Sequence, residues 1–169
     1  ISVLDVLSHE QFSELVMQYK DNLFRTARCI LKNSHDAEDA VCEAIYRAFR
    51  SLRTLKDTGA FRPWIYRITI NEAYQIVRRR WNAASIDDIG EIGDAGAEEP
   101  GEPSQLSAYV NSLPDHMRIP VYLFYYEDMR IMDIARILGL PAGTVKSRLA
   151  RAREQLREII LKEEVQHGF

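Results

Sequence analysis

Residues 131–157 read IMDIARILGLPAGTVKSRLARAREQLR, and this stretch decides the fold. Its first eight positions have the three- and four-residue apolar spacing of a short amphipathic helix. Gly139 suits the left-handed position that ends a helix, and residues 140–143 (LPAG) predict a tight turn. Residues 144–160 predict a basic helix, since residues 142–157 carry five Lys or Arg and one acid. A short helix, a glycine-containing turn and a longer basic helix together predict a helix-turn-helix.

Two further helices are predicted upstream of the helix-turn-helix. A short one follows Ser104, and residues 113–115 (LPD) start another that contains Val121 and Phe124. Pro120 lies one to two turns inside this second helix. We therefore expect it either to kink the helix or to shift its start.

The first 85 residues predict three more helices and no strand of useful length. Apolar residues at helical spacing mark the first: Phe12, Leu15, Val16, Tyr19, Leu23, Ala27 and Ile30. Asn33 breaks it, and Ser34 is the expected cap of a second helix. The stripe of this second helix is rich in alanine: Ala37, Ala40, Val41, Ala44, Ala48 and Leu52. A loop over residues 55–59 precedes a third helix, residues 60–80, with Pro63 tolerated in its first turn and Trp64 in the core. The predicted fold class is all-α.

The 169 residues divide into three segments of different charge, and the net charge of -3 conceals this difference. Residues 1–85 carry +3, residues 86–104 carry -7 without a single base, and residues 105–169 carry +1. The middle segment also holds four of the eight glycines and two of the six prolines. Such a composition predicts a flexible acidic linker between two small helical domains, residues 1–85 and 105–169. Nucleic acid stays a plausible partner, because the local field matters more than the net charge.

Enzymatic and metal-dependent functions find no support in the sequence. The four histidines show no ligand spacing with one another or with the cysteines, and there is no phosphate-binding glycine loop or nucleophile motif. We expect no cofactor and no metal. Cys29 and Cys42 make no disulfide framework, and burial is their default state. No export signal or membrane-crossing run is seen, so a cytoplasmic protein is expected.

Three stretches carry a family resemblance over nearly the whole chain. They are residues 36–41 (DAEDAV), residues 61–68 (FRPWIYRI) followed by Asn71 and residues 78–80 (RRR), and residues 138–154 (LGLPAGTVKSRLARARE). In this order, with a linker before the last, they resemble the extracytoplasmic-function (ECF) sigma factors of bacterial RNA polymerase. The resemblance implies a helical protein that binds core RNA polymerase and directs it to promoter DNA. It also implies an anti-sigma factor as a further partner.

The first stretch looks like the helix with which this family docks on the largest subunit of core polymerase. The resemblance places the contact on the face opposite the alanine stripe: Asp39, Cys42, Glu43 and Tyr46, with Arg47 beside them. The family commonly has Gln where this chain has Cys42. An amide that donates and accepts hydrogen bonds is thus replaced by a small, weak donor.

The second stretch looks like the element that reads and melts the -10 region of a promoter. Its polar residues follow one helical stripe, Arg67, Asn71, Gln75 and Arg78, with Arg79 next to it. Arginines would contact phosphates, while Asn and Gln can read base edges. By resemblance, the loop over residues 52–59 receives a flipped base. The family often has Asp at the position of Gln75.

The third stretch looks like the helix that reads the -35 element. The expected DNA-facing residues are Thr144, Lys146, Ser147, Arg148, Ala150 and Arg151. Lys146 and Arg151 would pair with base edges, and Thr144 and Arg148 would hold phosphates. Arg130 stands where the family has a small cap for the preceding helix, so Asp128 is the alternative cap.

Two other functions compete with promoter-directed initiation. The helix-turn-helix alone would also suit a transcription regulator that binds DNA without polymerase. A DNA strand-transfer enzyme with a helix-turn-helix tail would need a nucleophile and clustered arginines on a sizeable α/β domain. The 85 residues before the linker, which read as helical, do not provide one.

Overall fold

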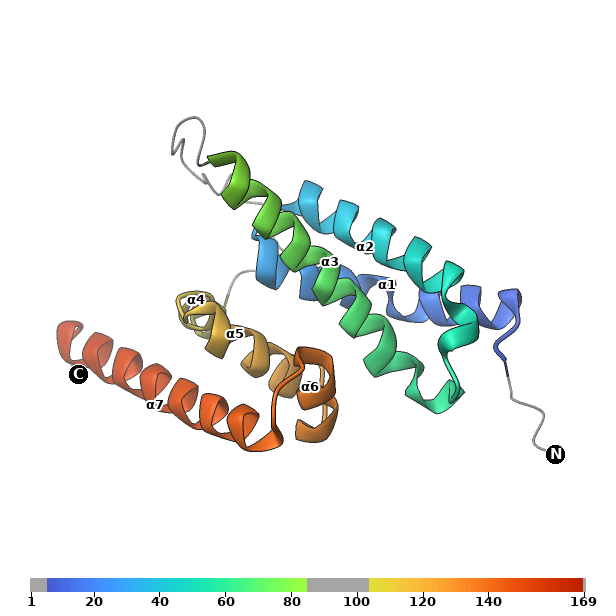
Figure 1. Ribbon diagram of the computed structural model, residues 1–169. Coiled ribbons are helices and arrows are strands. Elements are labelled where there is room, and N and C mark those ends of the chain that lie inside the picture. The colour runs from blue at the N-terminus through green and yellow to red at the C-terminus, as the bar shows by residue number, and fades with distance from the viewer. Residues whose placement is uncertain (1–5, 85–103, 169) are drawn as a thin grey trace. The chain divides into compact units, whose positions relative to one another are not determined.

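The computed structural model describes residues 6–84 and 104–168, which belong to two compact units. Every regular element within these two ranges is a helix, as Figure 1 shows. The predicted all-α class is therefore confirmed. The expected acidic linker, residues 86–104, lies outside the described residues except for Ser104.

The first unit consists of α1 (His9–Leu31), α2 (Ser34–Arg50) and α3 (Phe61–Ala84), and each helix packs on the other two. Two short 3-10 turns, η1 (Leu52–Thr54) and η2 (Thr58–Ala60), connect α2 to α3. The three helices fall where the sequence predicts them. Helix α3 continues four residues beyond the expected end at Arg80.

Alanines on α2 allow the helices of the first unit to approach closely. Ala37, Ala40, Ala44 and Ala48 are completely buried. Leu23 and Ala27 of α1 and Ile65, Ile70 and Ala73 of α3 are buried with them. Trp64 lies only half-buried beside Phe61, with ring centroids 5.8 Å apart, so the expectation that it belongs to the core holds in part. This alanine stripe fixes which side of α2 faces outward.

The cap of α2 differs from the expectation. Asn33 is the N-cap, and its side chain accepts a hydrogen bond of 3.2 Å from the backbone N–H of Asp36. Ser34 is already the first helical residue, and its hydroxyl instead accepts a bond of 2.7 Å from Nη1 of Arg28. An N-cap must have extended backbone angles, which Asn33 adopts at the break after α1.

The second unit consists of α4 (Gln105–Asn111), α5 (Asp115–Val121), η3 (Tyr122–Tyr126), α6 (Ile131–Leu138) and α7 (Ala142–Gln166). Ser104 caps α4 by accepting a hydrogen bond from the N–H of Ser107. Helix α7 begins two residues earlier and ends six residues later than the predicted 144–160. The turn before it is therefore only Leu140 and Pro141.

Pro120 leaves the predicted start of α5 in place. The helix begins at Asp115 and runs on directly into η3, a short π-helix. Proline has no N–H to donate, so the regular ladder loses a bond at Pro120. Downstream, the N–H of Glu127 bonds to the carbonyl of Tyr122, five residues back, at 3.2 Å. Beyond Val121 the α-helix therefore gives way to a π-helix, and the chain continues without a break.

The prediction that Asp128 caps α6 is wrong. Arg130 occupies the N-cap position without a side-chain cap bond, and Asp128 has a left-handed backbone with φ of 52°. Two residues before the N-cap, the Asp128 carboxylate is not at the position from which a side chain caps the first turn. Instead, Nε of Arg130 lies 3.7 Å from the carboxylate of Asp133 within the helix.

Candidate binding surfaces on α2, α3 and α7

The outer face of α2 carries the residues that the sequence predicts there. Asp39, Cys42, Glu43 and Tyr46 are all exposed, because the alanine stripe turns the opposite side of the helix inward. The default expectation of a buried Cys42 is thus wrong, while Cys29 is half-buried. The Tyr46 hydroxyl accepts a hydrogen bond of 3.2 Å from Nη1 of Arg50, whose guanidinium also lies 5.7 Å from the Tyr46 ring. We call these four exposed residues together with Arg47 the α2 face.

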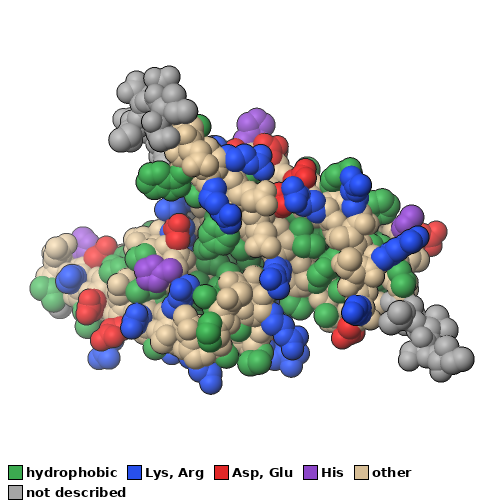
Figure 2. Space-filling view, in the orientation of Figure 1, with side chains coloured by type: hydrophobic (Ala, Val, Ile, Leu, Met, Phe, Trp, Pro, Cys, Tyr) green, Lys and Arg blue, Asp and Glu red, His purple; other side chains and the backbone are tan. Residues whose placement is uncertain are grey.

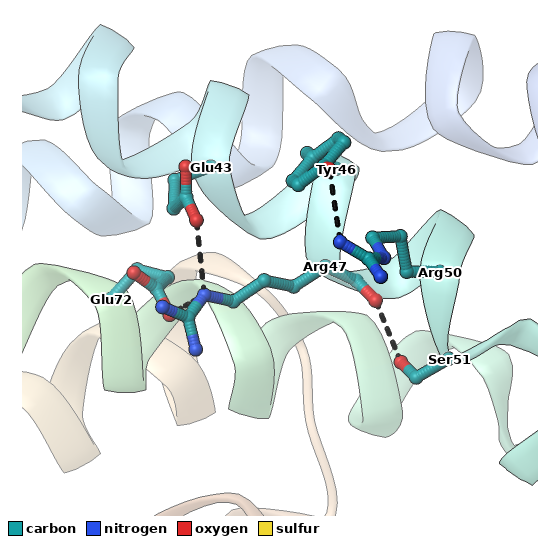
Figure 3. A network of polar contacts seen from close by, with 6 residues as sticks. All are labelled: Glu43, Tyr46, Arg47, Arg50, Ser51 and Glu72. Carbon is teal, nitrogen blue, oxygen red and sulfur yellow. Dashed lines mark hydrogen bonds and ion pairs between the residues drawn. The ribbon is translucent and has the colours of Figure 1, made fainter.

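Arg47 connects the α2 face to α3. Its Nε lies 3.1 Å from Oε1 of Glu43, one turn earlier on α2, and 2.8 Å from Oε1 of Glu72 on α3. Figure 3 shows the Arg47 side chain reaching from α2 toward Glu72, with Glu43 on its other side. Glu72 is buried, with only 4% of its side chain exposed, whereas half of the Arg47 side chain is exposed.

Glu72 is not among the residues predicted for this surface, although the sequence does contain a signal for it. Glu72 follows Ile65 and Thr69 at helical spacing and precedes Ile76, so it lies in the apolar stripe of α3. A carboxylate in such a stripe needs a partner, since a buried charge is otherwise costly.

A groove runs between α2 and α3 beside this ion pair. Charged side chains of both signs line most of it: Asp36, Asp39, Cys42, Glu43, Glu72, Ile76, Arg79, Arg80 and Ala83. Arg80 forms an ion pair with Asp36 across the groove. Arg79, predicted next to the polar stripe of α3, therefore borders the groove, on a different side from Arg67 and Arg78.

The polar stripe of α3 is presented to solvent as predicted. Arg67, Asn71 and Arg78 are exposed, and Gln75 is half-buried. Trp81, which is not among the predicted residues of the stripe, lies three residues after Arg78 and so on the same side of the helix. It is 74% exposed. The stripe thus ends in an exposed aromatic ring next to cationic side chains.

In the second unit, α6 and α7 form the predicted helix-turn-helix. Gly139 ends α6 in the left-handed conformation, with φ of 64°, and the N–H of Leu140 bonds to the carbonyl of Ala135 at 3.0 Å. Ile134 and Ala135 pack inward, together with Val145, Leu149 and Ala152 of α7. The turn and this apolar contact determine which side of α7 faces outward.

The outward side of α7 carries the predicted DNA-facing residues. Lys146, Ser147, Ala150 and Arg151 are exposed, and Thr144 and Arg148 are half-buried. No carboxylate of the described residues forms an ion pair with Lys146, Arg148 or Arg151. In Figure 2, Lys and Arg gather where α6 and the first half of α7 form the surface, and acids join them toward the end of α7.

Other kinds of site receive no support from residues 6–84 and 104–168. These residues contain no group of three His, Cys, Asp or Glu placed to hold a metal ion. Within the same ranges, no helix combines the length and the apolar character needed to cross a membrane.

Two small helical units, one with a helix-turn-helix and the other with an outward polar stripe, define a helical DNA-binding protein. Models of two protein families match it: Sigma-70 region 2 over residues 15–83 and Sigma-70, region 4 over residues 104–156. The chain belongs to the ECF sigma factors of the sigma-70 family.

Similar proteins agree with this assignment. The chain is 34% identical to the ECF RNA polymerase sigma factor SigE of Mycolicibacterium smegmatis over 94% of its own length, and spans 65% of the length of that relative. It is 30% identical to the ECF RNA polymerase sigma factor SigW of Bacillus subtilis, covering 88% of each chain. The sigma factor RpoE of Bartonella quintana, solved with the anti-sigma factor NepR, shares its fold. The TM-score is 0.79 at 24% identity, over 89% of this chain and 97% of that one.

Proposed function

We propose that this protein binds core RNA polymerase and directs it to promoters that carry -35 and -10 elements. The observation that carries the proposal is the outward orientation of three helix faces, on α2, α3 and α7, where the family motifs lie in the sequence. Residues 1–85 and residues 105–169 act as the two functional domains, and residues 86–104 connect them. The protein turns over no substrate of its own.

The α2 face is the proposed dock for polymerase. Asp39 and Glu43 supply negative charge, and Cys42 and Tyr46 lie between and beside them on an exposed helical surface. Complementary charge at such a surface raises the association rate and fixes the orientation of the partner. Cys42 makes the family's amide contact impossible, so the charged neighbours carry the docking.

The stripe on α3 is the proposed reader of the -10 element. Arg67 and Arg78 bind phosphates, while Asn71 and Gln75 reach base edges. Arg79 adds positive charge from the groove side of the helix. The loop over residues 52–59 receives the flipped base, whose unstacking costs a few kcal/mol that pocket contacts return. In this loop, Asp57 accepts a hydrogen bond of 2.9 Å from the N–H of Gly59.

Helix α7 is the proposed reader of the -35 element. Lys146 and Arg151 contact base edges in the major groove, and Ser147 and Ala150 approach the bases between them. Thr144 and Arg148, which are half-buried, hold phosphates. Since Lys146, Arg148 and Arg151 lack acidic partners among the described residues, their full charge is available to DNA.

We further propose an anti-sigma factor as a regulatory partner and the cytoplasm as the place of action. The complex of Bartonella quintana RpoE with NepR supports the first, since that sigma factor has a similar fold and is bound by such a partner.

Run-off transcription tests the proposed function. Core polymerase with this protein should yield a promoter-specific transcript, and core polymerase alone should not. A regulator that binds DNA without polymerase would instead give a specific DNA complex by itself and no transcript. That result would overturn the proposal.

A further inference from the structure

Glu72 is a buried carboxylate on a helix whose proposed contacts are all to DNA, yet its partner belongs to the α2 face. Its Oε1 lies 2.8 Å from Nε of Arg47, and the two side chains meet between α2 and α3 (Figure 3). Nothing in the reading of promoter DNA uses Glu72, because its side chain points away from the exposed stripe.

Arg47 is held from two sides. Glu43 contacts the same Nε from the exposed side, at 3.1 Å, whereas Glu72 contacts it from within the unit. The pair of Arg47 and Glu43 alone would be a surface ion pair that solvent screens and side-chain motion weakens. The buried carboxylate changes this, since Arg47 cannot swing into solvent without leaving the charge of Glu72 unpaired.

We propose that Glu72 is a positioning residue for polymerase docking. It holds the guanidinium of Arg47 in place and, through Arg47, the carboxylate of Glu43 in the conformation that the α2 face presents to polymerase. Side chains ordered before binding lose less entropy when the complex forms, so this arrangement raises the affinity without a contact between Glu72 and the partner. The inference rests on the proposed function of the α2 face.

The test measures the dissociation constant of the full chain for core RNA polymerase. Glu72→Ala and Arg47→Ala should each weaken binding by about fivefold to tenfold, which is the size of a moderate interface contact. Because Glu72 acts through Arg47, the Arg47 substitution should have little further effect in the Glu72→Ala background. Glu72→Gln keeps a hydrogen-bond acceptor but no charge, so its affinity should fall between wild type and Glu72→Ala.

Thr69→Val is the matched control. Thr69 is completely buried on the same helix, and its hydroxyl donates a bond of 2.9 Å to the carbonyl of Ile65 within α3. The variant removes a buried polar contact without touching Arg47. It should shift the unfolding midpoint and leave polymerase affinity at the wild-type value. Since Arg47 is half exposed, water can solvate it once Glu72 is replaced, so Glu72→Ala and Glu72→Gln should remain folded at the assay temperature.

Three results would overturn the inference. In the first, Glu72→Ala binds polymerase as tightly as wild type. In the second, the losses of affinity from Glu72→Ala and Arg47→Ala multiply in the double variant, which would mean that Glu72 does not act through Arg47. An equal loss of affinity in Thr69→Val would reduce Glu72 to a stabilising residue. In all three cases the unmodified chain still binds polymerase. If the unmodified chain does not bind, the proposed function itself fails.

Discussion

The two units prepare their outward charges in different ways. On the first unit, Arg47 is bound by Glu43 and the buried Glu72, and Arg80 is bound by Asp36. On the outward side of α7, Lys146 and Arg151 have no acidic partner among the described residues. One surface holds its cations in ion pairs that partly neutralise them, and the other keeps cations that no described carboxylate compensates.

This difference matches what each surface is proposed to bind. A protein partner presents a fixed pattern of charge, so a preordered surface gains affinity and specificity from it. DNA presents a dense row of phosphates, and unpaired cations contribute most there because each releases counterions. Polymerase affinity should therefore depend on the arrangement of charges on the α2 face. DNA affinity should depend on the total positive charge of α7 and on its individual base contacts.

Charge reversal on the α2 face should have the largest effect. Asp39→Lys combined with Glu43→Lys should abolish co-purification with core polymerase, a loss of affinity of about 100-fold or more. The fold should survive, because both residues are exposed, where substitutions usually change stability by about 0.5 kcal/mol or less. Pull-down with polymerase, together with circular dichroism of the variant, measures both quantities.

A control for this reversal is available on α1. Glu14 and Asp21 are also exposed, and changing both to Lys alters the net charge by the same amount. This variant should bind polymerase normally. Equal loss in both variants would show that net charge, rather than the pattern on the α2 face, controls docking.

Substitutions on α7 should be smaller in effect and should separate two kinds of contact. Lys146→Ala and Arg151→Ala should each cost about 1–3 kcal/mol and relax the preference at one or two positions of the -35 element. Arg148→Ala should weaken binding to all -35 sequences alike and lower the slope of log affinity against log salt concentration by about 1. Binding of the polymerase complex to a library of -35 sequences at several salt concentrations measures both effects.

An unchanged ranking of sequences in Lys146→Ala and Arg151→Ala would contradict this assignment. Helix α7 would then hold DNA without reading it. Specificity would have to come from the α3 stripe, between Arg67 and Arg78, and from the loop over residues 52–59.

The turn before α7 allows a paired test of how the second unit orients its helix. Gly139 has a left-handed backbone, so Gly139→Ala should lower the free energy of unfolding by about 1 kcal/mol. Gly143 lies inside α7 without a positive φ, and Gly143→Ala should raise it by up to about 0.5 kcal/mol. An added Cβ meets nothing within 4 Å at either position, so thermal unfolding of the two variants compares backbone conformation alone. If both substitutions changed the free energy of unfolding in the same direction, backbone conformation would not explain the difference between the two glycines.

Helical periodicity made most of the fold predictable. The alanine stripe of α2 and the apolar residues of α6 and α7 are buried where their spacing places them, because one side of each helix must face its neighbours. The outward residues of α2, α3 and α7 are predictable for the same reason, because burying the apolar side of a helix turns the opposite side to solvent. Helix type is harder to predict, and η3 shows why: a π-helix arises from a shift of backbone hydrogen bonds that no side-chain pattern specifies.

The parts of the surfaces that sequence reasoning missed depend on contacts between helices. Glu72 and Arg47 are 25 positions apart, and their pairing requires the register of α2 against α3. Cys42 needs no such contact: residue type alone favours burial, but its position opposite the alanine stripe places it outward, where the structure has it. Trp81 lies on the predicted stripe of α3 and could have been selected by extending the spacing by three residues.

The smallest expected effect concerns the polar link between the two ends of the second unit. The hydroxyl of Tyr109 on α4 and Nε2 of Gln105 both donate hydrogen bonds to Oε2 of Glu163 on α7. The bond to the Glu163 carboxylate, together with some burial, raises the pKa of Tyr109 above its usual 10.0. A pKa raised on folding means that the bond stabilises the unit fully below about pH 10 and is lost as the pH rises through the folded-state value.

Tyr109→Phe should therefore be less stable than wild type at about pH 8, and the difference should shrink as the pH rises through the folded-state pKa of Tyr109, above which tyrosinate and carboxylate repel each other. Amide exchange in α4 and near the end of α7 measures the change locally. The effect should be small, since solvent screens the pair. Glu163→Gln keeps an acceptor for Tyr109 but no charge, so its stability should depend less on pH over this range than that of wild type. A wild-type advantage over Tyr109→Phe that persists undiminished to high pH would mean that Tyr109 stabilises the unit by packing.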